Sequence, residues 1–256
     1  MNLVFASGFL FPQRLFGKIA YFRGVEEHLK GRHTALFAPV PPLASSKARA
    51  LDLADRIHEA FPAGRIHIIA HSMGGLDARN LIASNHRGLA EPGRIASLTT
   101  LATPHQGSPI ADLLVGRERG FFSFITNPIK QLLGKLPLDL GALKDLTAEN
   151  ARAIPDITKI GHIRYRSYAA TGRREGAATA RLLLPLHDIV FEETKGQPND
   201  GVVALNSARF GEFQAPPWPC DHLQMVGHDL DNLDLGPPSF DHLHEIDQII
   251  QTLPLP

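Results

Sequence analysis

The sequence predicts a single α/β domain with a mostly parallel central sheet flanked by helices, and three observations lead to this fold class. The chain has 256 residues, a length that suits one large domain, so we expect residues 1–256 to form one unit. Its composition, 43% hydrophobic and 20% charged, is that of a globular protein. Short apolar segments alternate with segments of helical periodicity, which is typical of a parallel sheet with helical crossovers.

The charge and cysteine content argue against several classes of protein. Lys and Arg number 26 together and balance the 26 Asp and Glu residues, so no global field favours nucleic acid or an anionic surface. The single cysteine, Cys220, rules out an intrachain disulfide and fits a reducing compartment. No apolar run approaches the ~20 residues needed to span a bilayer.

The first predicted strand follows Met1 directly. Residues 2–6 form an apolar segment, and no basic region, long apolar stretch or cleavage site precedes it. We therefore expect a cytoplasmic protein, unless the sequence is a trimmed mature form.

In the first part of the chain, the spacing of apolar residues and the positions of Pro and Ser predict the helices and strands. Residues 16–30 predict a helix, and residues 34–39 predict a second strand that ends in a proline cluster. Ser45 and Ser46 offer caps for a helix whose apolar residues recur at helical spacing until Pro62.

The next strand leads into a distinctive turn. An apolar run at residues 65–69 is followed by Ala-His-Ser-Met-Gly-Gly at 70–75 and by a helical segment at 76–82. The small-x-Ser-x-Gly pattern between a strand and a helix is that of a nucleophile elbow, which would place Ser72 on a strained bend with its hydroxyl exposed. The alternative is an ordinary turn in which Ser72 caps the helix.

The second half of the chain supplies further strands and a final helix. Residues 95–101 and 162–171 predict strands, whereas residues 173–197 predict an irregular connection. A turn signal follows at residues 199–201, and the last helix is expected to be capped by Ser239.

The segment at about 109–146 differs from the rest. It is rich in leucine, isoleucine and phenylalanine but is interrupted repeatedly by glycine and proline. Short amphipathic helices joined by hinges predict an inserted lid or cap here. The alternative is that these apolar side chains complete the core.

A catalytic serine needs a base and a carboxylate that orients the base. In the α/β-hydrolase fold these groups follow the order Ser, then Asp or Glu, then His, and Ser72, Asp200 and His222 satisfy this order. The expected oxyanion donors are two backbone N–H groups, that of Met73 after the nucleophile and that of Phe9 in the loop after the first strand.

Four other residues compete for these roles. Asp188 is the main rival for the acid, while Asp221 adjoins His222 on an extended segment, where neighbouring side chains diverge. His71 is expected to point away from a raised Ser72, and His105 is expected to shape the pocket.

Four segments together resemble the bacterial true lipases, the triacylglycerol lipase family of the α/β-hydrolase superfamily. They are Ala-His-Ser-Met-Gly-Gly at 70–75, Thr-Pro-His-Gln-Gly-Ser at 103–108, Asn-Asp-Gly-Val-Val at 199–203 and Asp-His-Leu-Gln-Met-Val-Gly at 221–227. The resemblance favours Asp200 over Asp188 as the acid and implies a serine hydrolase that cleaves acyl esters, expected to be lipid esters, through an acyl-enzyme. No cofactor is expected for this chemistry, and a lid formed by the interrupted apolar stretch at 109–146 predicts transient contact with a lipid interface.

The departures from this family carry expectations of their own. Residues 7–9 read Ser-Gly-Phe where these lipases have His-Gly-x, so the side chain that supports the oxyanion loop differs. Many relatives place a calcium-binding aspartate two residues after the base, where this chain has Gln224, a poorer ligand for a hard cation. The absence of a secretion signal and of a disulfide pair suggests an intracellular relative.

Several alternatives stay open from the sequence. A thioesterase, lysophospholipase or acyltransferase would use the same triad, and a binding protein could keep the fold without activity. His242 and His244 stand two apart on a helix and face different sides, which predicts solvated surface rather than a metal site.

Overall fold

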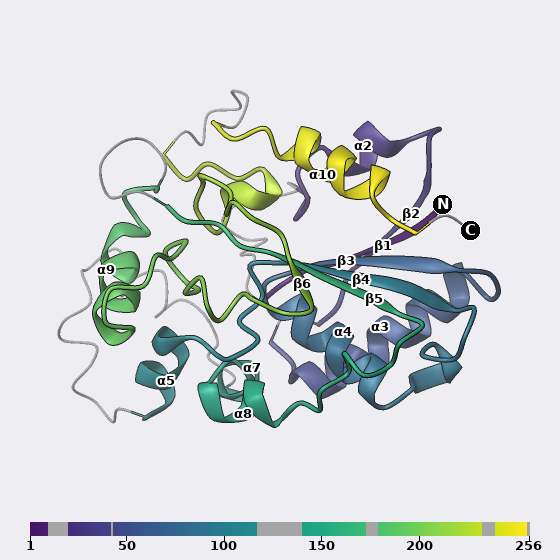
Figure 1. Cartoon of the computed structure of the whole chain (residues 1–256), viewed down its shortest axis with the longest axis horizontal. Coiled ribbons are helices and arrows are strands. Elements are labelled where there is room, and N and C mark those ends of the chain that lie inside the picture. Colours follow the sequence, from purple (N-terminus) through teal and green to yellow (C-terminus); the bar gives the residue numbers. More distant parts are fainter. Residues whose placement is uncertain (10–19, 42, 117–139, 173–178, 232–238, 255–256) are drawn as a thin grey trace.

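A six-stranded, fully parallel sheet forms the centre of the molecule (Figure 1). The computed structural model describes residues 1–9, 20–41, 43–116, 140–172, 179–231 and 239–254. The strand order is β2-β1-β3-β4-β5-β6, which confirms the predicted parallel sheet. The strands are β1 (Asn2–Ala6), β2 (Thr34–Ala38), β3 (Ile66–His71), β4 (Ile95–Leu101), β5 (Arg164–Tyr168) and β6 (Glu212–Phe213).

Helices cover both faces of this sheet (Figure 1). One face is covered by α2 (Val25–Leu29) and α10 (His242–Gln251), and the other by α3 (Ser46–Ala60) and α4 (Met73–Ala83). The remaining helical segments are η1 (His86–Gly88), α5 (Pro109–Gly116), α7 (Leu140–Asp145), α8 (Ala148–Ala153), α9 (Leu184–Glu193) and η3 (Gln224–Val226). Among the described helices, none combines the length and apolar character that a bilayer crossing requires.

Strand β1 is apolar on both faces after Asn2 because its side chains contribute to two cores. Successive side chains of a strand point to opposite faces. In β1, Val4 and Ala6 join the core under α3 and α4, whereas Leu3 and Phe5 join the core under α2 and α10. This double burial fixes the register of the strands and therefore the height at which each strand ends.

Local sequence signals predicted the boundaries of α3 correctly but not the cap of α10. The Ser45 hydroxyl accepts the Ala48 N–H at 3.3 Å and caps α3, which ends before Pro62 as predicted. The predicted cap of the final helix, Ser239, is wrong. The Asp241 carboxylate caps α10, because it accepts the His244 N–H at 3.0 Å. The Ser239 hydroxyl instead accepts a hydrogen bond from the Gln224 amide at 2.8 Å.

Two predicted segments differ in the structure. The helix predicted at residues 16–30 begins only at Val25 within the described residues, because Gly24 has a left-handed φ of 72° that no helix interior tolerates. The connection predicted as irregular at residues 173–197 contains α9. Val190 of this helix packs with Ile110 of α5, and this tertiary contact accounts for the helix.

The predicted lid lies mostly outside the described residues. Helix α5 begins that segment and α7 lies near its end, whereas residues 117–139 between them are not described. The inserted lid and the single-domain boundary remain predictions.

A buried ion pair joins α3 to α4 beneath the first loop. Arg49 Nε donates to Asp77 Oδ2 at 2.8 Å, and both side chains are fully buried. Burial raises the pKa of Asp77 to about 6, although the Arg49 guanidinium opposes this shift. The remaining Arg49 nitrogens donate to backbone carbonyls of Ser7, Gly8 and Pro41. The pair therefore supports both the helical layer and the loop after β1.

Replacing Arg49 with methionine should lower the free energy of unfolding by about 3–5 kcal/mol, because the buried Asp77 carboxyl would lose the partner that compensates its charged form. Urea denaturation measures this loss. Arg87→Met is the matched control, since Arg87 pairs with Asp55 at 2.7 Å while both side chains are about half exposed, and it should cost less than about 1 kcal/mol. Equal losses in the two variants would contradict the structural role of the buried pair.

Candidate active site

The first loop and the serine turn meet at the point where the strand order reverses. Strands β1 and β3 are neighbours, with β2 on the far side of β1 and β4 on the far side of β3. Their carboxyl ends carry Gly8 and Ser72 respectively. In open α/β sheets, ligands bind in the crevice outside the strand ends at such a switch point.

Ser72 alone connects β3 to α4, and its backbone is strained. Its φ of 55° and ψ of −131° lie outside the regions that non-glycine residues normally occupy. A Cβ on Gly74 would collide with the Ala6 carbonyl oxygen, and one on Gly75 would collide with the Thr103 side chain. The small residues after Ser72 are therefore required by close packing of α4 against β1 and the loop after β4, as the elbow pattern predicts.

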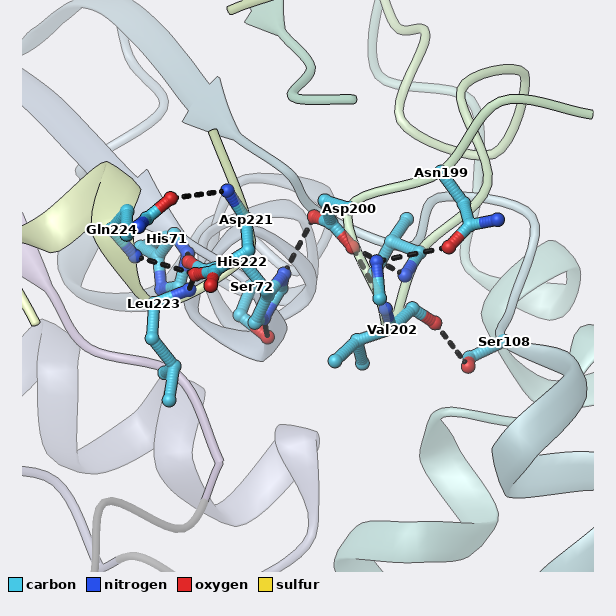
Figure 2. A network of polar contacts seen from close by, with 12 residues as sticks. His71, Ser72, Ser108, Asn199, Asp200, Val202, Asp221, His222, Leu223 and Gln224 are labelled. Carbon is cyan, nitrogen blue, oxygen red and sulfur yellow. Dashed lines mark hydrogen bonds and ion pairs between the residues drawn. The ribbon is translucent and has the colours of Figure 1, made fainter. Parts of the chain in front are cut away.

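Ser72, His222 and Asp200 form a continuous hydrogen-bonded chain (Figure 2). Ser72 Oγ lies 2.9 Å from His222 Nε2, and His222 Nδ1 lies 2.7 Å from Asp200 Oδ2. Because a carboxylate can only accept, His222 Nδ1 carries the proton and Nε2 is left to accept the serine proton. The His222 N–H also donates to the Asp200 carbonyl at 2.9 Å. The three residues thus have the geometry of a serine, a general base and an orienting acid.

The turn at residues 199–203 holds the Asp200 carboxylate. Its Oδ1 accepts the N–H groups of Val202 at 2.9 Å and Val203 at 2.7 Å, which leaves Oδ2 for the histidine. Asn199 Oδ1 accepts the Gly201 N–H at 2.9 Å and closes the same turn. These backbone donors stabilise a buried negative charge and fix its direction.

The two rival aspartates are directed elsewhere. Asp221 is buried, and its carboxylate accepts the N–H groups of Leu223 and Gln224 (Figure 2). It also accepts the Ala180 N–H. Burial raises the pKa of Asp221 to about 6 against the effect of these donors. Asp188 lies on α9 with its side chain 36% exposed, and Oδ1 is 3.8 Å from Nδ1 of the neighbouring His187.

The two rival histidines also lie outside the chain of Ser72, His222 and Asp200. His71 Nε2 donates to the His222 carbonyl at 3.0 Å, and its Nδ1 lies 2.6 Å from Tyr21 Oη. His105 is buried with its Nε2 3.0 Å from Thr100 Oγ1 and its ring stacked on Phe210 at 4.4 Å. Burial lowers the pKa of His71 and that of His105 well below the usual value, so both rings are neutral.

The expected oxyanion donor at Met73 has a simple structural origin. Met73 is the first residue of α4, directly after Ser72. The first N–H groups of a helix have no carbonyl partner within that helix, and the helix dipole places partial positive charge there. The Met73 N–H therefore has the character required of an oxyanion donor.

The expected donor, the Phe9 N–H, is oriented by the hydrogen bond that Arg49 makes to the carbonyl of the same Gly8–Phe9 peptide. Arg49 Nη2 binds the carbonyl oxygens of Ser7 at 2.6 Å and Gly8 at 3.2 Å. Across a trans peptide the N–H is antiparallel to the C=O, so the Phe9 N–H points away from Arg49. A Cβ on Gly8 would lie 2.7 Å from Ser72 Cβ, so the loop lies directly against the serine.

Arg49 and Tyr21 were not identified from the sequence, although both contact this loop. Arg49 lies 41 positions from Gly8, and Tyr21 lies 50 positions from His71. No local pattern marks either contact. The one available signal was the replacement of the family's histidine by Ser7, which indicated that other side chains must support the loop.

Gln224 stands where many of the lipases place a calcium-binding aspartate, and its side chain is bound by other protein groups. Its Oε1 accepts the Asp221 N–H at 2.9 Å, and its Nε2 donates to Ser239 Oγ, so both ends of the amide are occupied. Within the described parts of the chain, no group of three acidic, histidine or cysteine side chains could hold an ion. His242 was wrongly expected to be solvated, because it is buried and its Nε2 donates to the Arg23 carbonyl at 2.7 Å. His244 is exposed on the same helix.

Comparisons with known proteins agree with this geometry. Residues 41–131, which include the serine turn, match a family model described as the α/β-hydrolase fold. Triacylglycerol lipase 2 of Saccharomyces cerevisiae is 29% identical over 82% of this chain, and the chain spans 63% of that lipase's length. A triacylglycerol lipase of Pseudomonas fragi is 28% identical over 83% of both chains.

Solved structures support the fold. The mature Bacillus licheniformis lipase BlEst2 superposes with a TM-score of 0.64 at 20% identity, covering 88% of this chain and 86% of that one. Staphylococcus hyicus lipase gives a TM-score of 0.64 at 21% identity, covering 98% and 94%. The matched model and these structures show that the chain has the α/β-hydrolase fold, and its sequence is similar to those of triacylglycerol lipases.

Proposed function

We propose that this chain is a serine carboxylic-ester hydrolase of lipase type that cleaves acyl esters through an acyl-enzyme. One observation carries the proposal, namely the hydrogen-bonded chain from Ser72 Oγ through His222 to Asp200 at 2.9 and 2.7 Å. The strained φ of Ser72 supports it, since strained backbone concentrates at reactive sites and a serine that merely caps a helix needs no such conformation.

In the first half of the reaction, Ser72 Oγ attacks the ester carbonyl carbon while its proton passes to His222 Nε2. The carbonyl oxygen becomes an oxyanion, which the N–H groups of Met73 and Phe9 stabilise. His222 then donates the proton to the alcohol oxygen, the carbon–oxygen bond breaks, and the acyl group remains on Ser72.

In the second half, His222 takes a proton from water, and the resulting hydroxide attacks the acyl carbon. The second oxyanion collapses, Ser72 regains its proton from His222, and the carboxylic acid leaves. Asp200 stays ionised throughout, because its role is to hold the Nδ1 proton and to stabilise the imidazolium. No cofactor is required for any of these steps.

The proposed substrates are lipid esters. The relatives from Saccharomyces cerevisiae and Pseudomonas fragi are both named triacylglycerol lipases, and they match more than four-fifths of this chain. A series of soluble and emulsified esters of increasing acyl length would rank these substrates directly.

Replacing Ser72 with alanine should lower kcat for p-nitrophenyl esters by at least about 10⁴-fold, because the attacking oxygen is removed. The fold should persist, since the Ser72 side chain fills little volume. The measurement is initial-rate kinetics with circular dichroism of the same samples.

A second measurement on the same two proteins is covalent labelling of the reactive serine by a fluorophosphonate. The wild-type protein should take up one label per chain, and Ser72→Ala should take up none. Residual turnover within about 10-fold of wild type, or labelling of the folded variant, would refute the assignment of the nucleophile.

Replacing Asp200 with asparagine should lower kcat by about 10⁴-fold, because the amide can stabilise the wrong tautomer of His222. Asp188→Asn is the matched control on the neighbouring helix α9 and should stay within about twofold of wild type. If Asp188→Asn proves the more damaging of the two, the acid has been misassigned.

Activity should be unaffected by a metal chelator. Both ends of the Gln224 amide are engaged by protein groups, so the loop that carries His222 is closed without a cation. Dialysis against EDTA should leave kcat and the midpoint of thermal unfolding unchanged. A loss of either that added calcium restores would disprove metal independence.

A further inference from the structure

The Tyr21 hydroxyl contacts two of the segments that carry the proposed reacting groups, the loop before Phe9 and the end of β3 before Ser72. Its oxygen is 2.6 Å from His71 Nδ1 and is hydrogen-bonded to the Gly8 backbone. Gly8 precedes Phe9, and His71 precedes Ser72. The close approach of the loop is independent evidence, since a Cβ on Gly8 would lie 2.6 Å from Tyr21 Oη.

The direction of each hydrogen bond follows from its partners. His71 Nε2 faces the His222 carbonyl at 3.0 Å, and a carbonyl only accepts, so Nε2 carries the proton of the neutral ring. His71 Nδ1 must then accept the proton of the Tyr21 hydroxyl. The Tyr21 oxygen is left to accept the Gly8 N–H. The result is a directed chain from the oxyanion loop to the backbone of the base.

The backbone at Tyr21 is held in place by contacts that do not involve the Tyr21 hydroxyl. His228 Nε2 lies 2.8 Å from the Tyr21 carbonyl and 3.2 Å from that of Ala20, and the imidazole donates to both. The neighbouring Phe22 is buried against Phe5, with ring centroids 5.2 Å apart. Loss of the hydroxyl alone should therefore leave the backbone of this segment in position.

The two sides of the Ser7–Gly8 peptide are bound by different residues. Arg49 Nη2 binds the Ser7 carbonyl at 2.6 Å, while Tyr21 accepts the Gly8 N–H on the opposite side. The orientation of this peptide sets that of the next one, which carries the Phe9 N–H. Without the Tyr21 bond, Arg49 would still hold the carbonyls of Ser7 and Gly8, but the wide backbone freedom of glycine would let the Phe9 N–H shift within the site.

We propose that Tyr21 is a positioning residue, whose hydroxyl ties the oxyanion loop to His71 and through it to the His222 carbonyl, so that the oxyanion donor and the base keep a fixed spacing around Ser72. This inference rests on the proposed ester hydrolysis. Tyr21 touches no reacting atom and acts through Gly8 and His71. Its contribution therefore belongs to the transition state rather than to substrate binding.

The test compares Tyr21→Phe with wild type on a soluble p-nitrophenyl ester. The expected result is a fall in kcat on the order of 10–100-fold with KM within about twofold, since a misaligned oxyanion donor weakens only the transition state. The inhibition constant of an alkylboronic acid, which forms a tetrahedral adduct on the serine, should rise by the same factor. A purely structural hydroxyl would not link these two changes.

Tyr165→Phe is the matched control, because the Tyr165 hydroxyl is buried on β5 away from the site, and its kinetics should equal those of wild type. His71→Phe tests the same chain from its other end, since the phenyl ring fills similar space but can neither accept the Tyr21 proton nor donate to the His222 carbonyl, and kcat should fall similarly. Wild-type kcat in folded Tyr21→Phe, or a Tyr21→Phe chain that fails to fold while His71→Phe folds with full activity, overturns the proposal. An unreactive wild-type protein that takes up no fluorophosphonate would instead refute the proposed function.

Discussion

The left-handed backbone of Ser72 is the constraint on which the site depends. Strand β3 ends at His71 and α4 begins at Met73, so one residue must reverse the chain. Close packing against the Ala6 carbonyl and Thr103 leaves room only for glycine at positions 74 and 75. This turn raises the serine hydroxyl above the sheet and directs the first N–H of α4 toward the same space. It also directs His71 away from the reaction, into contact with Tyr21 and the His222 backbone.

The buried charges near this turn are stabilised by an ion pair and by hydrogen bonds to fixed protein groups. Arg49 is neutralised by Asp77, and its remaining donors bind the carbonyls of Ser7 and Gly8. Asp200 is stabilised by two peptide N–H groups as well as by His222. Such groups need no reorganisation when charge develops during a reaction, and they make the stability of the fold and the alignment of the site depend on the same contacts.

The sequence predicted those parts of the molecule that local patterns specify. The strands at residues 2–6 and 95–101, the capped helix α3 and the strand–serine–helix turn all follow from periodicity and small residues within a few positions. Helix α9 was missed because Pro185 opens it and its apolar residues are stabilised by α5, a contact that no local pattern reveals. Tyr21 and Arg49 were missed for the same reason, since their partners lie tens of residues away.

In the two adjacent imidazoles, His71 and His222, the hydrogen-bond partners determine which ring nitrogen carries the proton. Their ring centroids are 4.6 Å apart, yet His222 carries its proton on Nδ1 toward Asp200, whereas His71 carries its proton on Nε2 toward a carbonyl. Burial lowers the pKa of His71 most, and a charge on His222 lowers it further. A proton taken from Ser72 is therefore retained by His222, where a carboxylate compensates it, and cannot pass to the neighbouring ring. The site thus keeps the proton where the leaving alcohol needs it.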